Sequence, residues 1–188
     1  MRSITATGPT DRVWLAQRRT SPPATSSIGG CMTPVSRPLR FVLAGGLVAG
    51  ALDITYACVF WAIKAGVPAQ RIFQSVAAGL LGADSFKGGW PTAILGLALH
   101  FFIATTMSVT YYLVARRVPV LGRRPVPFGA AYGLLLYVIM NYVVVPLSAA
   151  GHGGAKDPVW VGLSIVVHAV LIGIPIALFT RRALRSAS

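Results

Sequence analysis

Charged residues are scarce in this chain, which argues against a soluble domain. Lys, Arg, Asp and Glu together make up 11% of the 188 residues, and four of these residues are acidic. A soluble domain of this length carries about 25% charged residues. Hydrophobic residues reach 55%, the mean hydropathy is +0.69, and the apolar residues gather in long blocks. Blocks of about 20 apolar residues are long enough to cross a bilayer as helices, so the composition predicts an integral membrane protein.

Cysteine is equally scarce, and the usual signatures of catalysis do not occur. Cys31 and Cys58 are the two cysteines, and their positions give neither a disulfide framework nor a metal spacing. The sequence holds no nucleophile motif, phosphate loop or strong metal signature, so we expect no catalytic residues, no cofactor and no bound metal. His152, in AAGHGGAKDP, fits a turn better than a ligand. These absences predict a non-enzymatic protein.

Four apolar blocks predict four membrane spans, at about residues 41–63, 90–115, 128–150 and 158–180. The predicted fold is an all-α membrane four-helix bundle that occupies residues 38–182. Residues 1–37 are rich in Ser, Thr, Pro and Arg and are predicted to be a disordered basic tail. Residues 183–188 are predicted to be a short C-terminal tail. The stretch MTPVSRPLR also raises the hypothesis that translation starts at Met32.

The loop after the first block contains a further helical pattern. Pro68 and Gly82 are suited to begin and end this helix. We expect an amphipathic helix that lies on the outer surface or folds against the bundle, with a re-entrant segment as the alternative. The apolar positions that recur with helical spacing are Ile72, Phe73, Val76, Ala77, Leu80 and Leu81.

Basic residues flank the apolar blocks and predict the orientation of the bundle. Such cations do not form a folded polar face, so the net charge of +13 does not indicate a nucleic-acid partner. Thirteen of the 17 cations fall in the two tails and the second loop, and we expect this side to meet anionic lipid headgroups. The opposite loops hold the remaining four, Lys64, Arg71, Lys87 and Lys156. The positive-inside rule therefore places both termini in the cytoplasm.

Each predicted span carries one strongly polar residue at a similar depth. Asp53, His100, Asn141 and His168 lie nine or ten residues from the expected outer end of their helices. At 1.5 Å per residue, this places all four roughly 15 Å below the outer boundary, near one plane. The four residues are therefore a candidate polar layer close to the bilayer centre.

Small residues on the same helix faces predict that this layer points toward protein. Rows of small residues let membrane helices approach closely. A polar side chain beside such a row is expected to turn away from lipid. The glycines proposed as helix-packing positions are Gly46, Gly50, Gly96, Gly129 and Gly133.

Two prolines follow the polar residues of the last two spans. Pro146 removes a hydrogen bond to the carbonyl of Tyr142, and Pro175 frees the carbonyl of Leu171. Kinks at these positions would bring backbone acceptors near the polar layer. Prolines also occur in membrane helices without a special role, and this plainer interpretation stays open.

The polar layer has three interpretations. An aspartate at a helix centre costs about 2.5–3.5 kcal/mol, so Asp53 is expected to be neutral or paired with a protonated His100 or His168. In the first interpretation the layer packs or regulates the bundle. In the second it belongs to a transporter or channel component that moves protons, ions or a small solute as a homo-oligomer, through faces such as Gly46–Gly50 and Gly129–Gly133. In the third it binds haem or a metal.

The chain resembles a family of small uncharacterised bacterial inner-membrane proteins. The segments that carry the likeness are AGGLVAGALDITYA, PAQRIFQSVAAGLLG, LGLALHFFIA, YYLVARRVPVL, MNYVVVPLSA and the final FTRR. A more distant likeness, to the YagU-like group of unknown function, rests on His100, Arg116–Pro119, His168 and Arg181–Arg182. The resemblance implies a multi-pass protein of the bacterial inner membrane and implies no activity. It is silent on Asp53, whose segment has no secure counterpart in that group.

Overall fold

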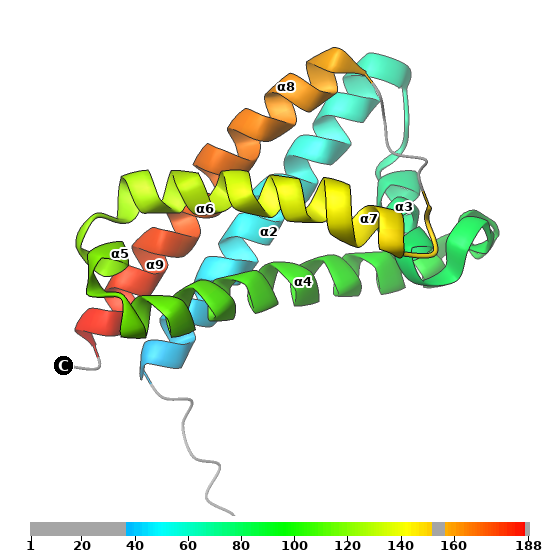
Figure 1. Cartoon of the computed structure of the whole chain (residues 1–188). Helices are drawn as coiled ribbons and strands as arrows, with labels where there is room; N and C mark the ends of the chain where they lie inside the picture. The colour runs from blue at the N-terminus through cyan, green and yellow to red at the C-terminus, as the bar shows by residue number, and fades with distance from the viewer. Residues whose placement is uncertain (1–36, 152–156, 187–188) are drawn as a thin grey trace, which may run out of the picture. The chain divides into compact units, whose positions relative to one another are not determined.

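The computed structural model describes residues 37–151 and 157–186, and four of its helices are long and apolar enough to cross a membrane (Figure 1). The first two are α2 (Arg37–Ala65) and α4 (Gly89–Arg117). The other two run over Pro125–Leu147 and Pro158–Arg185. No strand occurs within the described ranges. The structure thus confirms the all-α fold with four helices compatible with a membrane bundle.

The remaining elements are short or subdivide the last two spans. The third span consists of α6, a π-helical turn η2 and α7, and the fourth of α8, a π-helical turn η3 and α9. The bounds are α3 (Ala69–Leu81), η1 (Gly82–Lys87), α5 (Pro119–Arg123), α6 (Pro125–Ile139), η2 (Met140–Val144), α7 (Val145–Leu147), α8 (Pro158–Val167), η3 (His168–Gly173) and α9 (Ile174–Arg185).

The two π-helical turns have a common cause in the sequence. Each ends directly before a dipeptide whose second residue is proline, Pro146 after η2 and Pro175 after η3. A proline ring crowds the carbonyl four residues earlier and offers it no N–H. A wider turn moves that carbonyl aside without breaking the helix. The prolines therefore widen the two spans at the turns that carry Asn141 and His168.

Helix α2 is the centre of the packing. It contacts α4 on one side and α9 on the other, and α6 packs against η3 and α9. Gly46 permits the α2–α4 approach, because a Cβ at this position would lie 2.6 Å from the Cα of Thr105. Gly133 permits the α6–η3 approach, because its Cβ would collide with the carbonyl of His168.

The other glycines of the predicted rows also face neighbouring segments of the same chain. Gly50 faces Phe101 on α4, and Gly129 faces the backbone of Gly173. Gly96 packs on the carbonyl of Phe73 in α3. The two GxxxG faces considered for oligomer contacts are thus filled by the chain's own helices and do not offer free surfaces to a second copy.

Helix α3 folds against the N-terminal half of α4, which is one of the arrangements expected from the sequence. It starts after Pro68 and ends at Gly82, whose φ is +61°. The buried amide of Gln74 donates to the carbonyl of Gly89 at 2.9 Å. Thr92 of α4 donates to the carbonyl of Ser85 at 2.6 Å, which closes the corner between α3 and α4. This corner holds α3 beside the bundle.

The bounds of all four spans differ by a few residues from the sequence-based expectation, and the C-terminal ends of the third and fourth spans differ most among the C-terminal ends. The third span stops at Leu147 instead of residue 150, because Ser148 leaves the helical conformation and donates to the carbonyl of Val145 at 2.7 Å. The amide of Ala149 then donates to the carbonyl of Gly79 at 3.0 Å, which ties the chain to α3. The fourth span continues as helix to Arg185, three residues into the predicted C-terminal tail.

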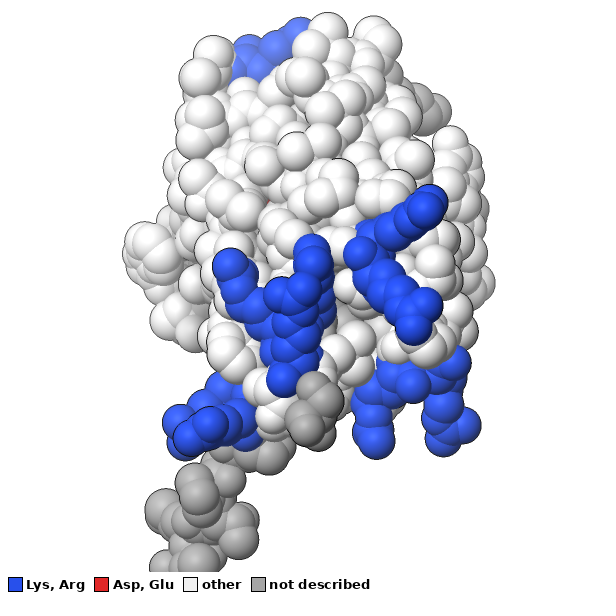
Figure 2. All heavy atoms as spheres, turned by 90° about the vertical axis from the view of Figure 1, so that its left-hand side faces the viewer, with Lys and Arg blue, Asp and Glu red and all other residues white. Residues whose placement is uncertain are grey.

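Arginines gather at one end of the bundle, where α2 begins, α4 ends and α9 ends. Figure 2 faces this side and shows most of the blue side chains in its middle and lower part, apart from one further blue patch at the upper edge. The acidic residues of the described ranges, Asp53, Asp84 and Asp157, lie elsewhere. The arginines of this end are Arg37, Arg40, Arg116, Arg117, Arg123, Arg124, Arg181, Arg182 and Arg185.

Candidate functional site

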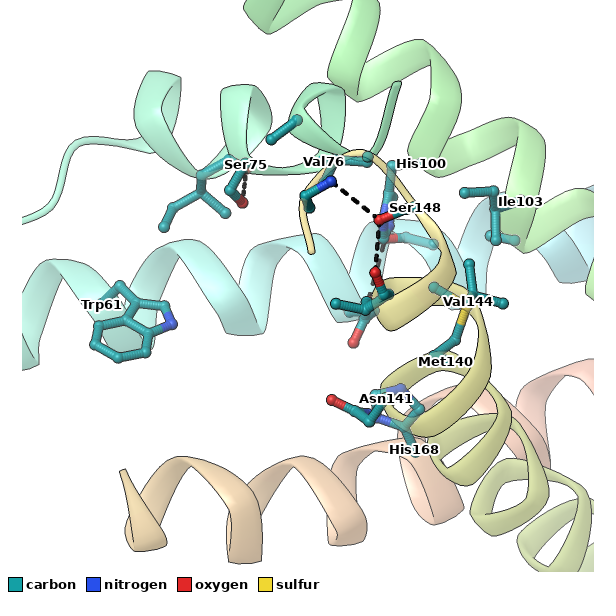
Figure 3. A pocket seen from close by; sticks show the side chains of 18 of the residues that line it. Trp61, Ser75, Val76, His100, Ile103, Met140, Asn141, Val144, Ser148 and His168 are labelled. Carbon is teal, nitrogen blue, oxygen red and sulfur yellow. Dashed lines mark hydrogen bonds and ion pairs between the residues drawn. The ribbon is translucent and has the colours of Figure 1, made fainter. Parts of the chain in front are cut away.

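The candidate polar layer borders a cavity of about 630 Å³ inside the bundle. Asp53 from α2, His100 from α4, Asn141 from η2 and His168 from η3 all line it. Figure 3 shows three of these side chains, His100, Asn141 and His168, around the same space. Four spans thus contribute one polar side chain each to a single cavity.

Asp53 and His100 form the closest contact between charged or ionisable groups in this layer. The Oδ2 atom of Asp53 lies 4.0 Å from the Nε2 atom of His100. The same Nε2 donates a hydrogen bond to the carbonyl of Gly50 at 2.9 Å. The two side chains are 26% and 14% exposed, respectively. Asp53 therefore has a histidine within ion-pair range, while the proton of that histidine is bound to the backbone.

The other two polar residues bond within their own helices. Nδ1 of His168 donates to the carbonyl of Ser164 at 2.8 Å. The amide of Asn141 donates to the carbonyl of Tyr137 at 2.9 Å. Among the described residues, no hydrogen bond joins any two of the four polar side chains. The layer is therefore a set of neighbours around a cavity, without a shared network of side-chain hydrogen bonds.

The depths of the four residues are less even than the sequence predicted. Asp53 lies twelve residues from Ala65, and His168 lies ten from Pro158. Asn141 lies six residues from Leu147, because the third span ends early. At 1.5 Å per residue, Asn141 is roughly 6 Å nearer to its helix end than His168 is to its own. These counts are less even than the nine or ten residues expected from the sequence.

A hydrophobic cluster closes the cavity on the arginine-rich side. Its central members are 6% exposed or less, and they come from α2, α4, α6, η3 and α9. Tyr132 of α6 seals the gap to α4, because its hydroxyl donates to the carbonyl of Met107 at 2.9 Å. The cavity is thus floored by side chains and extends toward the opposite end of the bundle, which is called the outer end here after the orientation expected from the sequence. The buried residues of this floor are Ala49, Tyr111, Ala115, Leu136, Ile172, Ile176 and Ala177.

An aromatic cluster forms the outer wall between α2 and α8. The rings of Tyr56 and Trp160 stack with centroids 5.2 Å apart and planes inclined by 9°. Phe60 and Trp61 pack on the same indole at 5.0 and 5.4 Å. Trp61 and Trp160 line the cavity. This wall was not among the features predicted from the sequence, although Tyr56 and Phe60 follow Asp53 by three and seven residues and so share its helix face.

An ion pair joins α2 and α8 just outside this cluster. Nζ of Lys64 lies 3.0 Å from Asp157, whose carboxylate also accepts from the amide of Trp160 at 3.0 Å. The Trp160 hydrogen bond and, next, the Lys64 contact hold the pKa of Asp157 below its ordinary value. Asp157 is therefore the N-cap of α8 and the link between the outer ends of the two helices.

Two observations bear on metal and haem binding at this site. Within the described ranges, no three His, Cys, Asp or Glu side chains lie close enough to hold a metal ion. Nε2 of His100, the atom that would ligate haem iron, is bonded to the Gly50 carbonyl. His152, Lys156 and the tail with its proposed Met32 start lie outside the described residues.

Comparison with protein-family models, curated proteins and solved structures finds no match to this chain. The likeness to the YagU-like group therefore stays an expectation from the sequence.

Proposed function

We propose that this multi-pass membrane protein binds a small solute in the cavity and couples that binding to protonation of the polar layer. In this role it is a non-enzymatic transporter or channel component. The observation that carries the proposal is the convergence of Asp53, His100, Asn141 and His168 on one cavity of about 630 Å³. This volume falls within the roughly 300–1,000 Å³ of small-molecule sites.

The hydrogen bonds favour this role over simple packing of the bundle. Polar side chains that stabilise membrane bundles do so by bonding across helices. Asn141 and His168 bond to their own helices, and His100 alone reaches a carbonyl of another span. This one contact supports a structural contribution by His100, which is the second candidate role of the layer.

The charge distribution supports an orientation in the membrane. Nine arginines surround the closed end of the cavity, while the described part of the outer end holds Lys64 and Lys87, each paired with an aspartate, and Arg71. By the positive-inside rule the closed end faces the cytoplasm, together with both termini. We propose the bacterial inner membrane, with the cavity opening away from the cytoplasm.

The packing bears on how a transporter would be assembled. The GxxxG faces are used inside the protomer, so a homo-oligomer would need other, lipid-facing surfaces. The charged end supports contact with anionic headgroups, since each exposed Lys or Arg near such a surface contributes about 1 kcal/mol.

The proposal is tested with the full chain in liposomes that contain a pH-sensitive dye. Cationic, neutral and anionic small solutes are added in turn, and the movement of protons is recorded. We expect proton movement with one solute class, and a loss of most of this signal in Asp53→Asn. Asp84→Asn is the matched control, because Asp84 is 79% exposed and lies outside the cavity.

Two outcomes would contradict the proposal. One is that no solute class moves protons beyond the level of protein-free liposomes. The other is that Asp53→Asn and Asp84→Asn behave alike. His100→Ala is measured in parallel, and the thermal stabilities of His100→Ala and Asp53→Asn are compared. A variant that stays folded but moves no protons has lost proton coupling, whereas a variant with a lowered unfolding temperature has lost folding stability.

A further inference from the structure

We infer that the solute is a protonated organic amine with an apolar, preferably aromatic, body. This inference rests on the proposed function and names the chemical class that the cavity recognises. It is carried by the hydrogen-bonding character of the polar residues, by the charge in the cavity and by the aromatic wall.

Three polar side chains of the inner cavity each donate a hydrogen bond to a backbone carbonyl. A carbonyl oxygen accepts, so the donors in these bonds are Nε2 of His100, Nδ1 of His168 and Nδ2 of Asn141. The ring nitrogens left over, Nδ1 of His100 and Nε2 of His168, are acceptors in neutral imidazoles, and so is Oδ1 of Asn141, while the second N–H of Asn141 is the one donor that remains on these three side chains. The carboxylate of Asp53 adds two further acceptors. The inner cavity is therefore rich in acceptors and poor in donors.

The serines of the outer part follow the same rule. The hydroxyl of Ser75 donates to the carbonyl of Ile72 at 2.6 Å, and that of Ser148 donates to Val145 at 2.7 Å. A ligand that enters this cavity finds acceptors on several sides. A solute that brings its own N–H donors satisfies them, whereas an anion or a pure acceptor does not.

The charge of the cavity has the sign that attracts a cation. Asp53 is the one acidic residue that lines it, and Arg71 is the one Lys or Arg, among the described residues. Arg71 lies on α3 in the outer part, where its guanidinium packs over the ring of Phe86 at 4.7 Å. Lys64, above the aromatic wall, is paired with Asp157. An ammonium group beside Asp53 therefore meets a carboxylate with no competing permanent cation in the inner part.

The aromatic wall provides a place for the apolar body of the solute. Trp61 follows Asp53 by eight residues, which separates them by about 12 Å along α2. A small arylalkylamine with its ammonium at Asp53 extends its ring along this helix face in the direction of Trp61 and Trp160. The indole faces also attract cations, which assists entry along the wall.

Binding of the amine is coupled to proton release. When Asp53 is protonated, its O–H bond breaks as the ammonium binds, and the proton leaves to water through the outer opening. The groups that face Asp53 are His100 on α4, His168 on η3, and Tyr56 on its own helix, with Arg71 farther out. A proton and the ammonium thus compete for the same carboxylate. Affinity therefore falls as the pH is lowered.

The test uses four probes that share one aromatic body and differ in the head group. They are 2-phenylethylamine, its N,N,N-trimethyl analogue, 2-phenylethanol and 3-phenylpropionate. Binding is measured by calorimetry on the full chain in lipid nanodiscs, with empty nanodiscs subtracted, in two buffers of different ionisation heat. We expect the amine to bind best, the trimethyl analogue more weakly because it has no N–H donor, and the other two at least tenfold more weakly than the amine. The buffer dependence is expected to show proton release with the amine.

The variants connect the result to the cavity. Asp53→Asn is expected to weaken amine binding at least tenfold and to leave the binding of 2-phenylethanol unchanged. Trp160→Leu is expected to weaken it severalfold, while Trp90→Leu has no effect, because Trp90 is exposed and lies outside the cavity. Far-ultraviolet circular dichroism and thermal unfolding establish that each variant is folded.

The outcomes separate this inference from the proposed function. Preferred binding of 3-phenylpropionate or 2-phenylethanol would overturn the amine assignment and leave a solute-binding cavity in place. Equal binding of the amine to wild type and Asp53→Asn would also overturn it. No binding by any of the four probes, together with no proton movement in the liposome experiment, would overturn both.

Discussion

Nε2 of His100 donates to the carbonyl of Gly50 at 2.9 Å, although a carboxylate oxygen of Asp53 lies 4.0 Å from the same nitrogen. The Gly50 carbonyl, one turn before Asp53 on α2, thus accepts the N–H that the carboxylate of Asp53 could otherwise have accepted. The arrangement orients the imidazole and keeps the oxygens of Asp53 directed at the cavity. If the layer served stability alone, we would expect His100 to donate its hydrogen bond to the carboxylate of Asp53.

Replacing Asp53 with leucine is therefore expected to maintain or increase stability. The substitution removes a carboxylate that is costly within a membrane helix and that accepts no hydrogen bond from a described residue. We expect the free energy of unfolding to stay equal or to rise by about 1 kcal/mol or more. Thermal unfolding in detergent, followed by tryptophan fluorescence, measures this. A loss of more than about 1 kcal/mol would favour a packing role for the aspartate.

The α6–η3 contact is expected to be sensitive to added volume. A methyl group at Gly133 would collide with the carbonyl of His168, which lies in a backbone segment that cannot move independently. We expect Gly133→Ala to lower the free energy of unfolding by about 1–3 kcal/mol. Gly162→Ala is the matched control in the fourth span, since nothing lies within 4 Å of its added Cβ. Equal effects of the two substitutions would contradict this packing.

The floor of the cavity depends in part on one tyrosine hydroxyl. Tyr132→Phe removes the 2.9 Å hydrogen bond to the carbonyl of Met107 and leaves the ring in place. We expect a loss of about 0.5–1.5 kcal/mol, measured by thermal unfolding. Tyr142→Phe should leave the midpoint unchanged, because Tyr142 is 72% exposed. If both variants unfold alike, the hydroxyl of Tyr132 does not hold the floor together.

The link between α2 and α8 is expected to depend on pH. The Trp160 amide and Lys64 lower the pKa of Asp157, so this carboxylate stabilises the fold at pH values above its ordinary pKa. That contribution is lost as the pH falls through the lowered pKa. Asp157→Ser preserves a cap but does not titrate. The difference in unfolding temperature between wild type and this variant should shrink between pH 6 and pH 2.5, and a constant difference would contradict the assignment.

The orientation can be read from chemical labelling. In a chain with Cys31→Ser and Cys58→Ser, single cysteines are introduced as Ala83→Cys in η1 and Ser186→Cys after α9. A membrane-impermeant maleimide added to intact cells should label the first and label the second only after permeabilisation. The opposite pattern would reverse the proposed topology.

The four spans were predictable because hydropathy over 20 residues outweighs local detail. The end of the third span was not, because it depends on Ser148 and on the Ala149–Gly79 hydrogen bond, a contact between segments 70 residues apart. Asp53, His100, Asn141 and His168 stood out as polar residues in apolar helices, and the structure places all four on one cavity. The side-chain rotamers that leave acceptors facing the cavity, and the stacking of Tyr56 on Trp160, could not be predicted because they depend on how the helices pack against one another.

The π-helical turns have a consequence for the length of the chain. Each wide turn contains about one residue more than an α-helical turn would need, and it rotates everything before it relative to everything after it by about 100°. Deleting a single residue between His168 and Pro175 would leave a continuous helix but would turn the Trp160 face away from α2. The fold therefore depends on the number of residues in these two turns as much as on which residues they are. Relatives that share the cavity should align here without a gap, and those without it should be one residue shorter.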